Sequence, residues 1–117
     1  MGKKVPVVLD VKRASAGLTN EDIVIPIEAP GQLLCVQRVC FEDEDNACTE
    51  ARFGAKRGSG LIWIESVELP TAGALYSIVD PIWLPGEYQI VVRFTGSTSG
   101  DDLYVLVLGY VTDEAGG

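Results

Sequence analysis

The carboxy-terminal third of the chain has the pattern that most restricts the fold. Between Tyr88 and Phe94 every second residue is apolar and most of the others are polar, which is typical of a strand with one face in water. Between residues 103 and 111 both alternating sets are apolar, so a strand there needs cover on two faces. The facing sheet of a small sandwich covers one face, and we expect loops or another chain to cover the other.

The two faces of this strand are chemically similar. One face consists of Leu103, Val105, Val107 and Val111. The other consists of Tyr104, Leu106, Leu108 and Tyr110. We predict that the second set contacts a partner, because exposed apolar surface of this extent usually marks an interface.

Alternating segments separated by turn residues predict about eight short strands. They are residues 5–11, 23–27, 33–41, 48–53, 61–69, 75–83, 88–95 and 103–111. No segment has the apolar repeat of an amphipathic helix, so we predict an all-β fold, either an antiparallel β-sandwich or a barrel. A jelly-roll-like sandwich of about eight strands is the preferred fold.

The connections are predicted from their turn residues. Residues 14–22 and the glycine-rich residues 54–60 are expected to be loops, and a bulge is expected near Glu65. The acidic residues 42–46 are expected to be a hairpin tip. Residues 84–111 are expected to form a final hairpin.

At 117 residues the chain has the size of one domain with one core. We expect residues 1–13 to be an extended arm or edge strand and residues 14–117 to be a single β-sandwich domain. No apolar run approaches the roughly 18 residues that span a bilayer. The apolar run after Lys3 and Lys4 is interrupted at Asp10, so we expect no membrane association and no export by a signal peptide.

Charge is distributed unevenly along the chain. Residues 1–13 contain four basic residues and one acidic residue, so their net charge is +3. The other 104 residues contain five basic and 16 acidic residues, so their net charge is −11. An acidic body repels phosphate backbones, so nucleic acid is excluded as a partner. The arm is predicted either to extend along a neighbouring subunit or to be a solvated terminus. Its contact residues would be Lys3, Lys4, Val5, Val7, Leu9 and Val11.

Residue types that perform catalysis are scarce. The chain has no histidine, which removes the commonest general base and metal ligand. We therefore expect no enzymatic activity and no cofactor. Cys35, Cys40 and Cys48 are expected to be reduced, and their spacing does not match a zinc site. A disulfide between Cys40 and Cys48 across an acidic hairpin is the less favoured alternative.

Three further clusters have alternative interpretations. Residues 42–46 contain carboxylates that form either a solvated hairpin tip or a calcium loop begun by Asp43 and Asp45. Arg52, Lys56 and Arg57 form either a mobile surface loop or an anion site. The tryptophans and tyrosines are core, interface or a sugar-stacking platform. Among them, Trp63 and Tyr88 are assigned to the core.

The segment Leu84-Pro-Gly-Glu-Tyr-Gln-Ile-Val-Val-Arg-Phe-Thr-Gly, followed by residues 100–105 and 109–111, resembles the final hairpin of small virion proteins of tailed bacteriophages. The resemblance covers less than a third of the chain. It implies a β-sandwich that decorates the capsid or lies at the head-to-tail junction, commonly as a trimer or ring. It assigns no catalytic or binding residue.

We therefore expect a non-enzymatic virion structural protein, a capsid decoration or cement protein that self-associates, with a trimer favoured, and binds the major capsid protein or another virion protein. Such a protein is assembled in the host cytoplasm and located in the virion. The alternatives are a head-tail connector or other phage structural protein, a carbohydrate-binding module and a calcium-dependent binding module. The sequence does not specify strand order, oligomeric number or partner.

Overall fold

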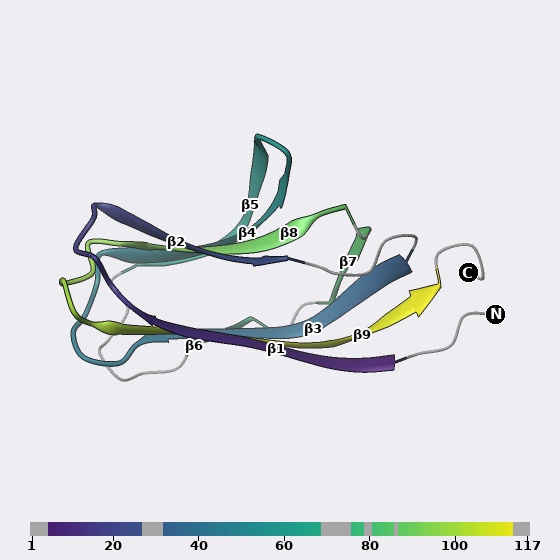
Figure 1. Cartoon of the computed structure of the whole chain (residues 1–117), viewed down its shortest axis with the longest axis horizontal. Coiled ribbons are helices and arrows are strands. Elements are labelled where there is room, and N and C mark those ends of the chain that lie inside the picture. Colours follow the sequence, from purple (N-terminus) through teal and green to yellow (C-terminus); the bar gives the residue numbers. More distant parts are fainter. Residues whose placement is uncertain (1–4, 27–31, 69–75, 79–80, 86, 114–117) are drawn as a thin grey trace.

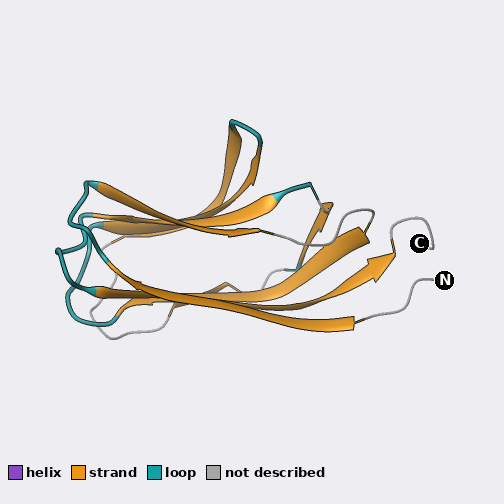
Figure 2. Cartoon of the chain, viewed as in Figure 1, coloured by secondary structure: helices purple, strands orange, loops and turns teal. Residues whose placement is uncertain are grey.

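The computed structural model describes residues 5–26, 32–68, 76–78, 81–85 and 87–113. These residues form nine β-strands in two sheets and no helix (Figures 1 and 2). Within them, no helix is long and apolar enough to cross a membrane. The strands are β1 (Val5–Ala14), β2 (Asn20–Pro26), β3 (Gln32–Asp43), β4 (Glu50–Arg57), β5 (Gly60–Glu68), β6 (Tyr76–Ile78), β7 (Ile82–Pro85), β8 (Gln89–Thr95) and β9 (Asp102–Asp113).

Every described strand pair is antiparallel. One sheet has the order β1-β9-β3-β6, with β7 also paired to β3, and the other has the order β2-β8-β4-β5. Thus β1 pairs with β9, β2 with β8, β3 with β6 and β7, and β4 with β5. This is the strand order of a jelly roll, an antiparallel ribbon folded over into two sheets. The prediction of an all-β antiparallel sandwich is confirmed. The predicted strand at 75–83 is divided into β6 and β7.

The core lies between the two sheets. It is built from the inward-facing residues of both, among them Phe41 on β3 and Phe94 on β8. Their rings meet edge to face, with centroids 6.4 Å apart. The inner face of β9 supplies Leu103, Val105 and Val107, each with no exposed surface. Burial of these alternating apolar side chains is the main force that holds the sheets together.

The prediction that residues 84–111 form a final hairpin is wrong. Strand β8 lies in one sheet and β9 in the other, so residues 96–101 cross between the sheets. The acidic segment after β3 also crosses, from β3 to β4, and so does the connection from β1 to β2. All three connections gather at one end of the sandwich, at the left of Figure 1. Turn residues mark where a strand ends, but they do not distinguish a hairpin from a crossover of about 10 Å between sheets.

Two predicted loops are shorter than expected. The connection between β1 and β2 is confined to residues 15–19, and the segment predicted as a loop at 54–60 is mostly strand, with a tight turn at Gly58, where φ is +58°. Gly54 lies at a bulge, where a Cβ atom would overlap the carbonyl oxygen of Ile62. This glycine marks close approach of two strands. The bulge leaves Ile64 without a partner on β4, as predicted near Glu65.

The glycine in β9 is also explained by the close approach of two strands. Gly109 lies opposite Val36, beside the bulge at Gln37 in β3. A Cβ atom on Gly109 would overlap the carbonyl oxygen of Cys35. The two central strands can approach at this point only because residue 109 has no side chain.

The substitution Gly109→Ala is expected to destabilise the protein by about 2 kcal/mol or more, because β3 and β9 must separate to admit the methyl group. Urea unfolding of the two proteins measures this loss. The matched control is Gly60→Ala, where the nearest atom to an added Cβ is the Arg57 carbonyl oxygen at 3.3 Å. Equal stability of the two variants would contradict the close approach of β3 to β9.

Candidate functional site

The outer face of the β1-β9-β3 sheet contains the surface predicted from the sequence. Leu103, Val105 and Val107 on the inner face of β9 are fully buried. On its outer face, Tyr104, Leu106, Leu108 and Tyr110 are only partly buried. These four side chains are therefore not enclosed by the described part of their own chain. They form an apolar row along the middle strand of the sheet.

Neighbouring strands extend this row sideways. Val8 of β1 lies opposite Leu108, and its side chain is 64 % exposed. Trp83 of β7 is 52 % exposed, and its ring meets that of Tyr110 edge to face with centroids 5.8 Å apart. Cys35 of β3 lies between Trp83 and Tyr110 in the register. We call Val8, Trp83, Leu106, Leu108 and Tyr110 the outer patch.

The described part of the amino-terminal segment is an edge strand, which is one of the two predicted alternatives, and not an extended arm. Strand β1 pairs with β9 along all ten of its residues, so it is part of the sheet and not an extension toward a neighbour. Its side chains Val7, Leu9 and Val11 are partly buried and pack against the core. Val5 is 46 % exposed at the far end of the strand. The predicted contacts at Lys3 and Lys4 lie outside the described residues.

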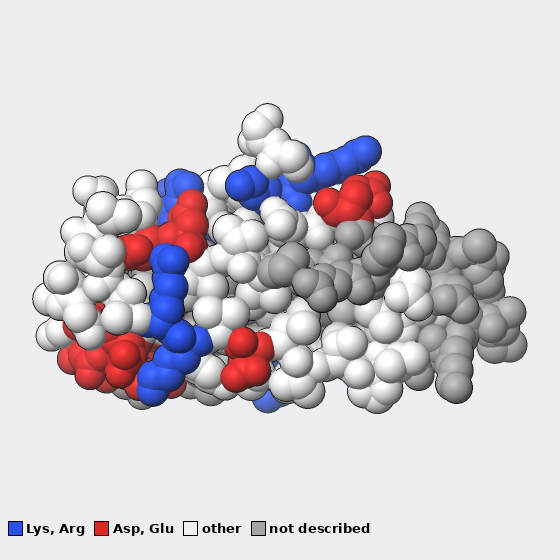
Figure 3. Space-filling view, in the orientation of Figure 1, with Lys and Arg blue, Asp and Glu red and all other residues white. Residues whose placement is uncertain are grey.

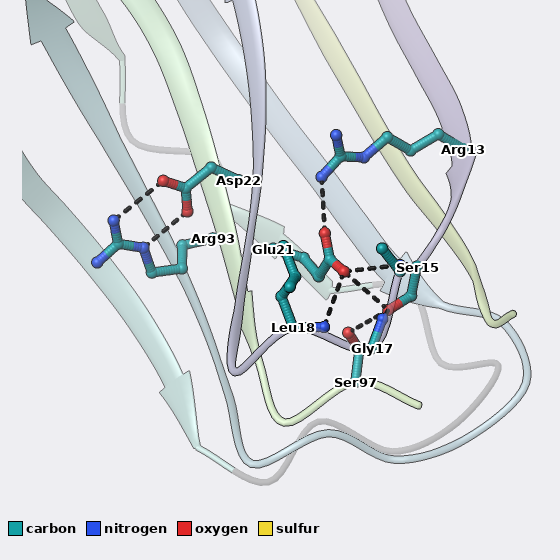
Figure 4. A network of polar contacts seen from close by, with 9 residues as sticks. Arg13, Ser15, Gly17, Leu18, Glu21, Asp22, Arg93 and Ser97 are labelled. Atoms are coloured by element: carbon teal, nitrogen blue, oxygen red, sulfur yellow. Dashed lines mark hydrogen bonds and ion pairs between the residues drawn. The ribbon is translucent and has the colours of Figure 1, made fainter. Parts of the chain in front are cut away.

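Buried carboxylates occupy the end of the sandwich where the three connections cross. Glu21 is 3 % exposed and accepts four hydrogen bonds, from Arg13 Nη2 at 3.1 Å, Ser15 Oγ at 3.3 Å, and the backbone N–H groups of Ala16 and Leu18 at 2.7 and 3.2 Å (Figure 4). Ser15 Oγ also lies 2.9 Å from Ser97 Oγ. Glu21 therefore has donors on both oxygens and a positive charge beside it.

A second group of carboxylates lies at the same end, where acidic side chains gather at the lower left of Figure 3. One oxygen from each of Asp43, Asp45 and Asp101 lies within 4.8 Å of the other two. Asp43 and Asp101 are 1 % and 3 % exposed. The sequence placed Asp43 and Asp45 together. It did not indicate Asp101, which reaches them through the crossover after β8.

The pKa values in this group reflect burial and mutual proximity. Burial, and then the side chain of Asp101, raises the pKa of Asp43 to about 6. Burial acts in the same direction on Asp101, but hydrogen bonds from Asp43, Asn46 and Thr98 outweigh it, so the pKa of Asp101 is lowered. The two side chains therefore compete for one proton.

The basic residues predicted as an anion site do not converge. Arg52 pairs with Glu50, and Arg57 lies 3.9 Å from Glu87 and over the ring of Tyr88. A cavity of about 310 Å³ beside Arg52 is lined by Glu50 and Glu65 as well as by this arginine. The carboxylates in its wall make it a poor site for an anion.

The prediction that Trp63 belongs to the core is wrong. Its ring lies on the outer face of the second sheet, with the guanidinium groups of Arg93 and Arg52 at 4.9 and 5.8 Å from its centroid. Arg93 is fixed there by two hydrogen bonds to Asp22, at 2.7 and 3.0 Å (Figure 4). With arginines against it, this ring is no open platform for a sugar. Tyr88 is partly buried against the core, and the side chain of Tyr76 lies outside the described residues.

The three cysteines are buried thiols. The hairpin that would have placed Cys40 opposite Cys48 is absent, because β3 and β4 lie in different sheets. Burial, and then the nearby charge of Asp43, raises the pKa of the Cys48 thiol to about 11. This thiol is packed in the core and is unsuited to be a nucleophile.

No protein-family model and no curated protein matches the chain. Among solved structures it is similar to dimeric latent PorU from Porphyromonas gingivalis, at 11 % identity and a TM-score of 0.44, with 93 % of this chain and 13 % of that chain covered. It is also similar to a structure of infectious bursal disease virus, Gx strain, at 13 % identity and a TM-score of 0.39, with 100 % and 34 % covered. The chain thus spans 13 % and 34 % of the two chains. One of the two is a viral structure, but with TM-scores below 0.5 neither supports an argument about function.

The three cysteines give a direct test of how tightly their surroundings are packed. With a pKa of about 11, only about one Cys48 thiol in a thousand is a thiolate near pH 8. Because all three cysteines are buried as well, Ellman's reagent is expected to modify almost none in the native protein and three after denaturation in urea. Rapid modification of the native protein would contradict the described burial.

Proposed function

We propose that the protein is a non-enzymatic structural protein of a virion, a decoration or cement protein that associates with copies of itself and with a capsid lattice through the outer patch. The single observation that supports this most is the exposure of Val8 and Trp83 beside the partly buried outer face of β9. Large apolar side chains joined across strands β1, β9 and β7 form the kind of surface that protein interfaces bury.

The geometry of the patch favours a protein partner. The outer face of the sheet presents alternate side chains of each strand, and β1 is an edge strand of the described sheet. A partner can therefore cover the face and also extend the sheet along β1 by main-chain hydrogen bonds. Trp83 and Tyr110, already in contact, are residue types that interfaces use as anchors.

The residue types that usually perform catalysis also support a structural role. The chain has no histidine, and the buried Glu21 is used in hydrogen bonds that join β1, β2 and their connection. The buried Cys48 has a raised pKa. The phage capsid as the lattice is the part of the proposal that comes from the resemblance of residues 84–111.

A carbohydrate-binding module is the second candidate, and the exposure of Trp83 is the observation that favours it. A sugar stacks on one aromatic ring, whereas a protein interface uses the whole outer patch. A glycan array separates the two functions, since a lattice adhesive binds none of the glycans.

Light scattering over a range of concentrations tests self-association. The wild-type protein is expected to exceed the 12.5 kDa of one chain, and Val8→Glu is expected to reduce it to a monomer, because a carboxylate in the patch cannot be desolvated on association. Val8 is 64 % exposed, so the substitution leaves the core intact. The matched control is Ile62→Glu on β5, 62 % exposed and outside the patch. A wild-type monomer, or equal loss of association in both variants, contradicts the proposed surface.

A further inference from the structure

Buried carboxylates lie at two places at the crossover end of the sandwich, Glu21 at one and Asp43 and Asp101 at the other, with the exposed Asp45 beside the second pair. The two places differ in how the charge is compensated. Glu21 has four hydrogen-bond donors, and one of them is the guanidinium of Arg13 at 3.1 Å. Asp43, Asp45 and Asp101 form no ion pair among the described residues. An ionised buried carboxylate without a cation nearby is costly, and either a bound proton or a bound cation relieves that cost.

The hydrogen bonds of Asp43 show where that charge is missing. Its Oδ1 accepts the backbone N–H groups of Asp45 and Asn46, at 3.1 and 3.2 Å. Its Oδ2 is buried and has no hydrogen-bond partner. The side chain of Asp101 is within hydrogen-bonding range of Asp43 but offers no donor when both groups are ionised. An unpartnered carboxylate oxygen is therefore buried on a residue that already has a second carboxylate beside it.

The other two carboxylates are held in place by separate contacts. Asp101 Oδ1 accepts a hydrogen bond from Asn46 Nδ2 at 2.6 Å, and its Oδ2 accepts the Thr98 backbone N–H at 3.1 Å. Asp45 Oδ2 accepts the backbone N–H of Asp102 at 2.7 Å. These bonds fix three oxygen ligands from two different connections within 4.8 Å of one another.

We propose that Asp43, Asp45 and Asp101 bind a calcium ion that links the β3–β4 connection to the β8–β9 connection. The ligand atoms are all oxygen atoms, at the end of β3 and on two connections. This arrangement suits the flexible coordination of Ca²⁺ better than the strict octahedron of Mg²⁺. The ion supplies the positive charge that the buried Oδ2 of Asp43 lacks. It joins two segments that are more than 50 residues apart in sequence, as the Asn46–Asp101 hydrogen bond already does.

Calcium binding is tested by calorimetric titration of the whole chain with CaCl2 near pH 7.5 and by its melting temperature in CaCl2 and in EDTA. One ion per chain is expected. The melting temperature is expected to be about 5–10 °C higher when free calcium is about a hundredfold above its Kd. No heat of binding and no shift would overturn the proposal, and an equal shift with MgCl2 would overturn the assignment to calcium.

Variants separate the site from general effects of charge. Asp101→Asn and the exposed Asp45→Asn are each expected to abolish the calcium shift, because each removes a ligand charge while keeping the shape of the side chain. Asp10→Asn on β1 makes the same change in net charge away from the site and is expected to keep the full shift. A shift retained in Asp45→Asn and Asp101→Asn, or lost in Asp10→Asn, would refute the site. Asp45→Asn and Asp101→Asn both lie at the crossover end and leave the residues of the outer patch unchanged, so their result is independent of the association experiment.

Discussion

The double pairing of β9, with β1 on one edge and β3 on the other, is the interaction on which the rest of the structure depends. It places the last described strand of the chain between the first and the third. Because both edges of β9 are occupied, β8 has to pair elsewhere, and it lies between β2 and β4 in the second sheet. The order of the jelly roll and the crossover of three connections at one end follow from this arrangement. Gly109 permits it by allowing β3 and β9 to approach.

The crossovers have an energetic consequence at that end of the sandwich. Connections that pass between two sheets expose backbone and polar side chains to the edge of the core, and these groups must find partners there. Glu21 meets this requirement with two backbone N–H groups, Ser15 and Arg13. Asp43 meets it on one oxygen only. Because of this difference, we assign Glu21 a structural role and propose Asp43 as a ligand of a metal ion.

The fold does not choose between the proposed functions, because jelly rolls occur in both capsid proteins and lectins. The choice depends on the surface. An exposed Trp83 by itself suits a sugar, whereas its contact with Tyr110 and its continuity with Leu108 and Val8 suit a protein interface. The proposed calcium site lies on the crossover connections and not in the outer patch, so it acts on the stability of the sandwich.

The sequence by itself determined the properties that depend on neighbouring residues. Period-two alternation identified most of the strands, the lack of helices among the described residues and the two apolar faces of residues 103–111. It could do so because the side chains of a strand alternate between its faces wherever the strand lies. Only the tertiary structure decided which strands pair. It replaced the final hairpin with a crossover, turned Val7, Leu9 and Val11 inward, and moved Trp63 from the core to an outer face. It also brought Asp101 to Asp43. These outcomes depend on contacts between distant segments, and local periodicity contains no information about which distant strand completes a sheet.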